Sequence, residues 1–413
     1  MKDARVGLVD SGVSWLGKVP PYWTKKPLWS MFERIKDVDH PDEQMLSVFR
    51  EFGVVAKDSR GNINKTAENR SIYQLVHPGW LVANRMKAWQ GSVGISTLRG
   101  IVSGHYICFA PRHDEDNRYL NWLLRSTTYT NGYALLSRGV RIGQAEIDND
   151  EFRLLPILLP PSEEQRAIAD YLDRETARTD RLIEEQQRLI EMLRERRADL
   201  ISHAVLDVTS ERIQLRRLVD VIDCAHVTAE FVDDDRRFPV ASIRECQGAT
   251  VDLSACNYTT AEFFEHLRAA NRAPRAGDLL FIRNVSVGLV AVVRDDMPEF
   301  AIGQETVLLR RKSDVYPFYL RYALIGAEAR HAIEGAMIGS TFRRINVSAV
   351  RSLPVPAPPL EEQRRIAAYL DQQTAKIDTL IAETERFIEL AHERRSALIT
   401  AAVTGQVDVR EMA

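Results

Sequence analysis

Two stretches of the chain carry apolar residues at alternating steps of four and three positions, and neither stretch contains glycine or proline. The repeated positions of the first stretch are Thr179, Ile183, Gln186, Ile190, Leu193, Arg197, Leu200 and Ala204. Those of the second stretch are Ile377, Ile381, Thr384, Ile388, Ala391, Arg395, Leu398 and Ala402. This spacing predicts heptad seams, along which helices pack against one another. We therefore expect two long helices that pair as an antiparallel coiled coil, with the polar Gln186 and Thr384 fixing their register.

The two stretches are copies of one another. Residues 156–205 match residues 354–403 at 28 of 50 positions without a gap. Each copy opens with a double proline followed by a glutamate pair, which is typical of a helix start. A period near two hundred residues is too long for a solenoid unit, so the sequence predicts a duplicated protein. At about 1.5 Å per residue, each helix forms a rod on the order of 60 Å long, and we interpret the pair as a spacer.

Short elements of both kinds precede each long helix. In the first half, residues 73–86 predict a strand, a Pro-Gly turn and a second strand, while residues 103–110 predict a further strand. Residues 119–125 predict an amphipathic helix, and the spacing of apolar side chains over residues 28–35 predicts another short helix.

The second half repeats this order with different side chains between the landmarks. Three segments of the first half have counterparts in the second: residues 79–86, 102–109 and 119–124 correspond to residues 277–284, 302–309 and 319–324. In the same way, Ser92, Val93 and Gly94 correspond to Ser286, Val287 and Gly288. The predicted fold class is α+β: two α/β domains separated by two long antiparallel coiled-coil helices, in an internal pseudo-two-fold duplication. The expected domains are a lead-in and first domain (1–155), a spacer helix (156–207), a second domain (208–353) and a final spacer helix (354–413).

Charge is distributed unevenly although the net charge is only −3. Residues 57–112 contain eight basic and two acidic side chains, whereas residues 162–205 contain eleven acidic and eight basic ones. A basic domain beside a mildly acidic helix favours local contact with phosphate groups. The four cysteines form no CxxC pair, which indicates reduced thiols and no zinc site. Without an apolar leader or a run of about twenty apolar residues, we expect a cytoplasmic protein.

Catalytic motifs are missing from the sequence. No GxGxxG follows a predicted strand, and the GxxxxGK[ST], GxSxG and HExxH patterns do not occur. No Asn or Asp precedes a Pro-Pro pair followed by an aromatic residue. We therefore predict a non-catalytic chain that binds no metal and no cofactor itself.

Arg, Lys, Asn and Gln on loops beside strands are the candidates for reading DNA bases, because they form paired hydrogen bonds with guanine or adenine edges. In the first half they are Arg85, Lys87, Gln90, Arg138, Arg141 and Gln144. In the second half they are Arg283, Asn284, Arg343, Arg344 and Asn346. The alternative for each one is ordinary solvation or contact with a phosphate group.

An ERR triplet recurs near the end of each long helix, at residues 195–197 and 393–395. It has two interpretations, a solvated helix face or a docking surface for a partner or DNA. The candidate partner-binding residues are Arg196, Arg197, Arg394 and Arg395.

The repeated PPxEEQRxIAxYLD start and ERRxxLIxxAV end of the helices resemble the specificity subunit of type I restriction-modification systems, as does WLGKVPPYW at residues 15–23. The resemblance covers essentially the whole chain. It implies two target recognition domains, each reading one half of a split site in double-stranded DNA, with the paired helices setting the gap. It also implies two methyltransferase subunits that use S-adenosylmethionine and two restriction subunits that use ATP and magnesium. The family places the partner surface on the duplicated helices and their flanks.

Two other classes of protein share some of these features. A fused methyltransferase-specificity enzyme would have the same domains, but it needs a donor-binding domain that no segment here supplies. A coiled-coil scaffold or DNA-binding regulator would bind its site tightly without a methyltransferase.

Overall fold

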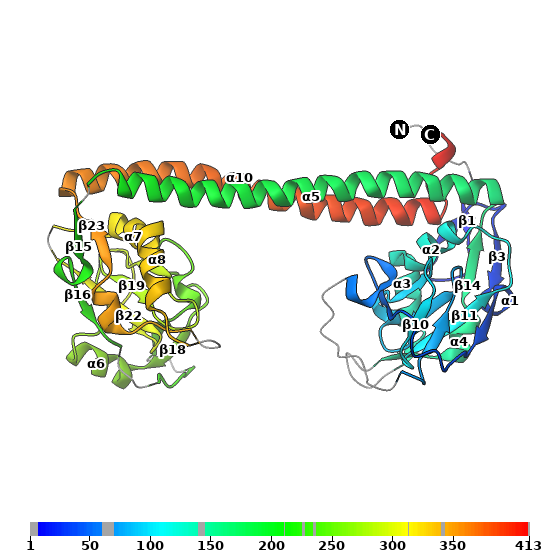
Figure 1. Ribbon diagram of the computed structural model, residues 1–413, viewed down its shortest axis with the longest axis horizontal. Coiled ribbons are helices and arrows are strands. Elements are labelled where there is room, and N and C mark those ends of the chain that lie inside the picture. Colours follow the sequence, from blue (N-terminus) through cyan, green and yellow to red (C-terminus); the bar gives the residue numbers. More distant parts are fainter. Residues whose placement is uncertain are drawn as a thin grey trace. The chain divides into compact units, whose positions relative to one another are not determined.

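The computed structural model describes residues 7–59, 70–138, 145–209, 211–224, 228–233, 237–312, 314–339 and 343–411. Contacts divide the chain into two compact units (Figure 1). Unit 1 comprises Met1–Gln186 and Arg386–Ala413, and unit 2 comprises Gln187–Glu385. Each of the two long helices contributes to both units.

A four-stranded antiparallel sheet with the order β4-β11-β8-β9 forms the centre of unit 1. Its strands are β4 (Phe32–Ile35), β8 (Leu81–Asn84), β9 (Val93–Ile95) and β11 (Tyr106–Pro111). Alternate residues of β8 enter different cores: Leu81 and Ala83 pack with α2 (Asn117–Arg125) and α3 (Thr127–Leu135). Val82 enters a smaller core with β5 (Leu46–Phe49), β6 (Gly53–Ala56), β7 (Gln74–Val76) and β10 (Gly100–Val102). This alternation is expected for a sheet covered on both faces.

Several short elements complete unit 1. They are the antiparallel pairs β1 (Val9–Asp10) with β2 (Lys18–Val19), β3 (Thr24–Pro27) with β14 (Pro156–Leu159), and β12 (Ser137–Arg138) with β13 (Glu146–Ile147), together with α1 (Leu28–Met31) and α4 (Asn149–Arg153).

Unit 2 is built on the same frame. Its sheet has the order β16-β22-β19-β20, with β16 (Val219–Ile222), β19 (Leu279–Ile282), β20 (Val290–Val292) and β22 (Thr306–Arg311). Leu279 and Phe281 pack with α7 (Pro317–Ile325) and α8 (Ala327–Ala336), while Leu280 and Ile282 enter the core on the other face. That second core includes residues of β17 (Arg237–Ala241), α6 (Ala261–Ala269) and β21 (Ala301–Ile302). The strand β18 (Asn257–Thr260) pairs with β17. The remaining elements are β15 (Arg212–Gln214), paired with β23 (Pro354–Pro356), and α9 (Val347–Arg351).

The predicted duplication is confirmed by the way each domain closes. In unit 1, Leu28 N donates to Leu155 O over 2.9 Å, and in unit 2 Leu215 N donates to Leu353 O over the same distance. A two-stranded sheet lies beside each of these bonds, β3-β14 in unit 1 and β15-β23 in unit 2. The frame is therefore repeated, while the elements on the second face of each sheet differ.

The short helix predicted over residues 28–35 is only partly present. α1 ends at Met31, and Phe32–Ile35 forms β4. β4 pairs with β11 from Phe32, opposite Pro111, to Ile35, opposite Cys108. Hydrogen bonds to a neighbouring strand thus replace those of the expected helix, and three apolar residues could not distinguish the two outcomes.

The predicted match of Ser286, Val287 and Gly288 with Ser92, Val93 and Gly94 is out of step with the strands. Val93 lies opposite Ala83 in unit 1, and Val290 lies opposite Phe281 in unit 2. Measured from these strands, Gly288 corresponds to Gly91, and both have a φ close to 90°. The shared feature is a left-handed glycine two residues before the next strand, a conformation that glycine adopts without a steric cost.

The two long helices, α5 (Ser162–Leu206) and α10 (Leu360–Val403), are continuous. In unit 2, Arg197 Nε lies 2.7 Å from Asp378 Oδ1, and Arg194 Nη2 lies 3.0 Å from Glu385 Oε1. The residue numbers of α5 therefore decrease along the contact while those of α10 increase, as in an antiparallel pair. In unit 1, Arg395 Nε lies 2.9 Å from Asp180 Oδ1. The predicted antiparallel pairing is confirmed within each unit.

A glutamine fastens the start of each long helix to its domain. Gln165 accepts a hydrogen bond from Asp116 N (3.0 Å) and donates to Pro160 O (2.9 Å). Gln363 repeats the arrangement with Tyr316 N (2.8 Å) and Pro358 O (2.8 Å). Both side chains are buried, which explains structurally why the EEQ sequence occurs twice.

Candidate nucleic-acid interface

Arg85 and Arg283 occupy the same position in the two units, directly after the central strands β8 and β19. Arg85 N donates to His105 O (2.9 Å) and Arg85 O accepts from Ile147 N (3.0 Å). Arg283 N donates to Glu305 O (2.8 Å) and Arg283 O accepts from Ile345 N (2.9 Å). The frame therefore fixes both arginine backbones between a strand and the segment that leads into α4 or α9.

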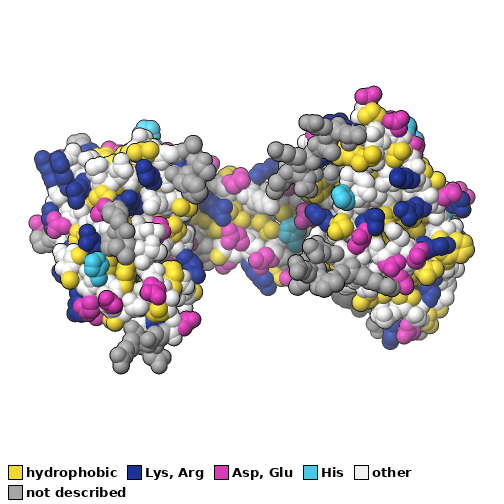
Figure 2. Space-filling model, turned by 90° about the horizontal axis from the view of Figure 1, so that it is seen from below, with side chains coloured by type: hydrophobic (Ala, Val, Ile, Leu, Met, Phe, Trp, Pro, Cys, Tyr) yellow, Lys and Arg dark blue, Asp and Glu magenta, His cyan; other side chains and the backbone are white. Residues whose placement is uncertain are grey.

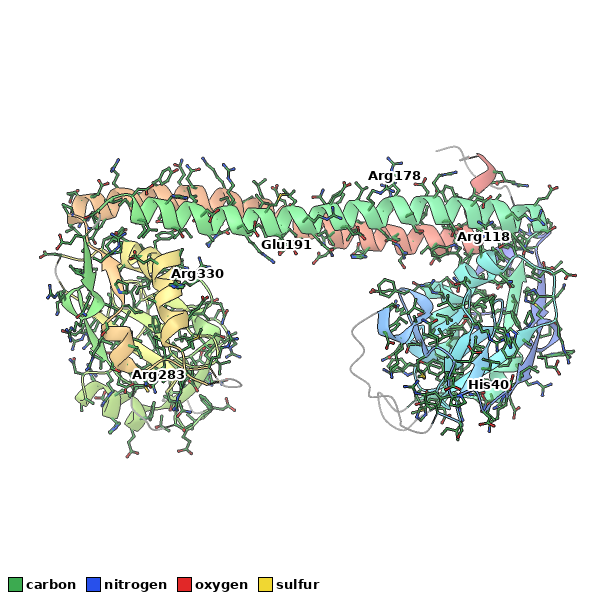
Figure 3. All side chains as sticks on the ribbon, in the orientation of Figure 1. His40, Arg118, Arg178, Glu191, Arg283 and Arg330 are labelled. Atoms are coloured by element: carbon green, nitrogen blue, oxygen red, sulfur yellow. The ribbon has the colours of Figure 1, made fainter. Side chains whose placement is uncertain are left out.

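Different carboxylates hold the two side chains. Arg85 forms an ion pair with Glu146 of β13, whereas Arg283 Nη1 donates to Asp223 Oδ1 over 2.7 Å, just beyond β16. Figure 3 marks the position of Arg283 in unit 2. In both arginines, Nε is buried without a hydrogen-bond partner among the described residues. A carboxylate that restrains one side of a guanidinium leaves its other N–H groups in a fixed orientation, as paired recognition of a base requires.

The structure brings the candidates of unit 2 together. Asn284 and Arg344 form an isolated antiparallel bridge, and Arg343 O accepts a hydrogen bond from Val285 N (3.0 Å). Asn346 caps α9 through its backbone, with no side-chain cap bond. Arg343, Arg344 and Asn346 are all exposed, so this surface presents polar side chains from two loops.

The turn between these polar residues is centred on Val285, which is exposed and lies outside the set of predicted residues. A search limited to Arg, Lys, Asn and Gln passes over an apolar side chain. Its only sequence signal is a valine in a loop between two strands.

In unit 1, Lys87 and Gln90 are exposed on the loop after β8, where Lys87 precedes a 3-10 turn (Ala88–Gln90) and Gln90 is its last residue. Arg138 lies in β12, where its backbone pairs with Glu146, the carboxylate that holds Arg85. The Arg138 side chain, Arg141 and Gln144 lie outside the described part of the structure. Three of the six candidates of this unit are therefore placed with their side chains.

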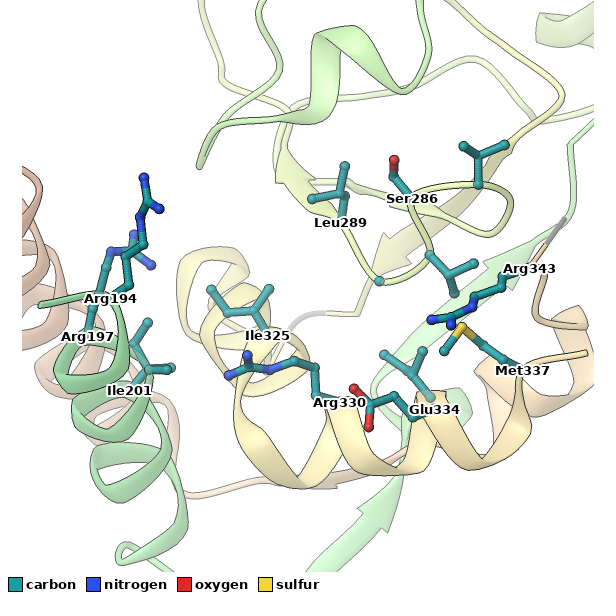
Figure 4. A pocket seen from close by; sticks show the side chains of 15 residues that line it. Arg194, Arg197, Ile201, Ser286, Leu289, Ile325, Arg330, Glu334, Met337 and Arg343 are labelled. Atoms are coloured by element: carbon teal, nitrogen blue, oxygen red, sulfur yellow. The ribbon is translucent and has the colours of Figure 1, made fainter. Parts of the chain in front are cut away.

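A pocket lies beside each ERR triplet. In unit 2 it has a volume of about 540 Å³ and is lined by Arg194 and Arg197 on one side and by Arg343 on the opposite side (Figure 4). In unit 1 the corresponding pocket, of about 310 Å³, is lined by Arg125 and Arg395 among others. Burial, and then the charge of Arg395, lower the pKa of Arg125 to about 10. Both pockets thus concentrate positive charge where the domain meets the helices.

The arginines of the ERR triplets have two different environments. Arg197 and Arg395 form the interhelical ion pairs described above, so they join the helices within their units. Arg196 and Arg394 are exposed. Their prediction as partner-binding residues stays a prediction.

On the face shown in Figure 2, basic and acidic side chains are interspersed over both units. Within the ranges that the structure describes, no three His, Cys, Asp or Glu side chains are grouped so that they could hold a metal ion. No helix in those ranges has the length and apolar character needed to cross a membrane.

Comparisons with known proteins give consistent results. A curated relative, the type I restriction enzyme StySPI specificity subunit of Salmonella potsdam, is 27% identical over 107 residues. That alignment spans 26% of this chain and only 23% of the relative. A solved structure described as the structural basis of complex assembly and conformational transition of the type I R-M system has 17% identity and a TM-score of 0.75. It covers 94% of this chain and 100% of its own, and it shows that the fold is shared.

A second solved structure, the HsdS subunit from Thermoanaerobacter tengcongensis, has 18% identity and a TM-score of 0.49, with coverage of 96% and 100%. The family model described as "Type I restriction modification DNA specificity domain" matches residues 59–192 and 236–389, which is more than half of the sequence. The chain, with its two copies of one domain and helix, therefore belongs to the family of type I restriction-modification DNA specificity proteins.

Proposed function

We propose that the chain is the DNA sequence-specificity component of a type I restriction-modification complex and that each unit reads one half of a split DNA site. The observation that carries this proposal is one frame used twice with different loops. Arg85 and Arg283 have equivalent backbone hydrogen bonds but are held by different carboxylates, Glu146 and Asp223. Family membership supports the same function.

The exposed side chains around these arginines suit the chemistry of DNA. Arginine forms paired hydrogen bonds with guanine O6 and N7, while Asn and Gln do so with adenine. Lys87, Arg343 and Arg344 are exposed and positively charged, which suits contact with phosphate groups. Base recognition in unit 2 would then involve Arg283, with phosphate contacts around it.

The partners belong to the proposal as well. A second set of apolar residues on the long helices remains exposed: Leu182, Leu189 and Met192 on α5, and Leu380, Phe387 and Leu390 on α10. In the alignment of the two copies, the three positions on α5 match the three positions on α10. Both copies have therefore kept apolar side chains there. Exposed apolar residues retained at corresponding positions of two copies favour docking of two equivalent partner subunits.

We infer that those partners are two methyltransferase subunits, joined by two restriction subunits, and that the chain itself is non-catalytic. S-adenosylmethionine would then be bound by the methyltransferase subunits, and ATP and magnesium by the restriction subunits. This chain would need no cofactor of its own.

The test is co-expression of the chain with its methyltransferase subunits, followed by mapping of N6-methyladenine across the host DNA. Methylation confined to one split motif with a fixed gap is the expected result. The same methyltransferase subunits without the chain provide the control, and they should leave the motif unmodified. If the chain alone binds a site tightly and no methylation depends on it, the protein is a DNA-binding regulator instead.

A further inference from the structure

The loop that follows Arg283 turns around Val285, whose φ is 62°. Ser286 N donates to Asn284 O over 2.7 Å, which is the i to i+2 hydrogen bond of a γ-turn with positive φ at its centre. A β-branched residue is a true outlier in this region, because its side chain crowds the backbone. The native turn is therefore strained at this residue.

Packing of the side chain does not compensate for that strain, since Val285 is 64% exposed. The turn is instead held by backbone contacts, the hydrogen bond from Val285 N to Arg343 O and the bridge between Asn284 and Arg344. Glycine would form the same backbone contacts without strain. Valine therefore offers no advantage to the folded chain, and its side chain is best explained by contact with another molecule.

The surroundings of Val285 indicate what that molecule is. The residue lines the 540 Å³ pocket of unit 2 together with Arg343 and Arg197 (Figure 4). Arg343 is exposed, and Arg283 precedes the turn by two residues. An exposed apolar group among arginines fits the edge of a DNA base pair, because the 5-methyl group of thymine is the apolar feature of the major groove.

The equivalent loop of unit 1 supports this assignment. Between Arg85 and Gly91 it exposes Lys87 and Gln90, whereas the loop of unit 2, which ends at Gly288, exposes Val285. The same place in the frame thus presents polar side chains in one unit and an apolar one in the other. Such a difference is expected if the two units read different half-sites.

On the basis of the proposed function, we propose that Val285 is a specificity-determining residue whose isopropyl group contacts the 5-methyl group of a thymine in the half-site read by unit 2. Cytosine lacks this methyl group, so the contact favours a T·A pair over a C·G pair at that position. Arg283 would supply hydrogen bonds to a neighbouring base.

The experiment uses the full chain in complex with its methyltransferase subunits. Each thymine of the methylated motif is replaced in turn by deoxyuridine, which lacks only the methyl group, and duplex binding is measured. One replacement in the half-site of unit 2 is expected to weaken binding about fourfold, the effect of losing the burial of a single methyl-sized group. V285G and V285A should bind the thymine duplex more weakly and no longer respond to that replacement.

Thermal unfolding separates this role from a structural one. V285G is expected to melt at a higher temperature than V285A, because glycine relieves the strain and alanine does not. V9A, which truncates an exposed valine of β1, is the matched control and should keep the full response to deoxyuridine.

Two results would overturn the inference: a wild-type complex insensitive to every thymine replacement in that half-site, or a V285G complex that remains sensitive. Failure of the wild-type complex to bind or methylate any split motif would instead contradict the proposed function, and the inference would fall with it.

Discussion

Arg283 and its counterpart Arg85 illustrate how a constant backbone carries a variable site. Both arginines follow the central strand of their sheet and share the same two backbone hydrogen bonds. Only the carboxylate that orients each guanidinium differs, Asp223 for Arg283 and Glu146 for Arg85. Since a guanidinium orientation selects which base edge it meets, the choice of carboxylate affects specificity without altering the fold.

Replacing Arg283 by lysine should relax recognition of one half-site. Lysine keeps the positive charge near Asp223 but lacks the planar fork needed for paired hydrogen bonds with guanine. We expect R283K to lose ~1–3 kcal/mol of discrimination at a single base pair. Methylation mapping of the co-expressed complex measures this loss. R85K is the matched control and should relax recognition of the other half-site. If the methylated motif of R283K is identical to that of the wild type, Arg283 does not read a base.

His113 makes unit 1 sensitive to acid. Its Nδ1 accepts a hydrogen bond from Glu115 N (3.2 Å). Its ring and the Phe32 ring lie edge to face, with their centroids 4.7 Å apart. Burial lowers the pKa of His113 below its usual 6.5, and this effect exceeds the opposing influence of Glu115 and Asp114. The unfolded chain therefore takes up the proton first as the pH falls. Stability due to neutral His113 is complete above about pH 6.5 and is lost as the pH falls toward the folded pKa.

Urea unfolding at pH 7.5 and pH 5.5 tests this expectation. In H113N the amide oxygen can still accept the Glu115 N–H bond, but the side chain does not ionise. The free energy of unfolding should fall more between these pH values for the wild type than for H113N. Equal changes would show that His113 does not contribute to acid sensitivity.

At the scale of elements, the paired glutamines attach the long helices to the domains. Gln363 is buried and bonds both Tyr316 N and Pro358 O. Q363L would leave these backbone groups unpaired, which should lower the free energy of unfolding by about 1–3 kcal/mol. Chemical denaturation checks the loss, and Q165L should behave similarly in unit 1. E361Q is the control, because Glu361 lies in the same helical turn but is exposed, and its free energy of unfolding should stay within about 0.5 kcal/mol of wild type. An equal loss of stability in E361Q and Q363L would show that the buried hydrogen bonds of Gln363 do not attach the helix.

The long helices could be predicted because their sequence signal extends over many turns. Ile183, Ile190 and Ile377 are buried as the heptad spacing required, and the buried Thr384 hydroxyl donates to Leu380 O (2.7 Å) in its own helix. Short elements carry a much weaker signal. The spacing of the apolar side chains in residues 28–35 fits a helix, yet Phe32–Ile35 forms a strand that pairs with β11. Pairing with a distant strand is not encoded in a local pattern.

The candidate site could be predicted by residue type but not by geometry. Arg283, Asn284, Arg343 and Arg344 do lie on adjoining loops, because a bridge joins Asn284 to Arg344. The orienting carboxylates, Glu146 and Asp223, have no signal in the sequence, since each comes from a different element. The strained turn at Val285 is equally invisible, because valine has no preference for positive φ.

At the scale of the whole molecule, the closing bonds define segments that are interchangeable in principle. The first and last residues of the segment from Leu28 to Leu155 are joined by a backbone hydrogen bond. Leu215 and Leu353 are joined in the same way at the two ends of the second segment. Because both ends of each segment meet at equivalent bonds beside equivalent two-stranded sheets, exchange requires no new junction geometry. Each segment also contains the candidate base-reading loops of its own unit.

Replacing residues 28–155 by a second copy of residues 215–353 should therefore yield a chain that folds and carries the same reading loops twice. Under the proposed function, the methylated motif is expected to contain the half-site of unit 2 in both positions, while the gap stays unchanged because both long helices are retained. Methylation mapping after co-expression gives the answer. The reciprocal chain, with residues 28–155 in both places, should produce the half-site of unit 1 twice. A motif that changed in only its gap, or in both halves at once, would mean that recognition is not confined to these segments.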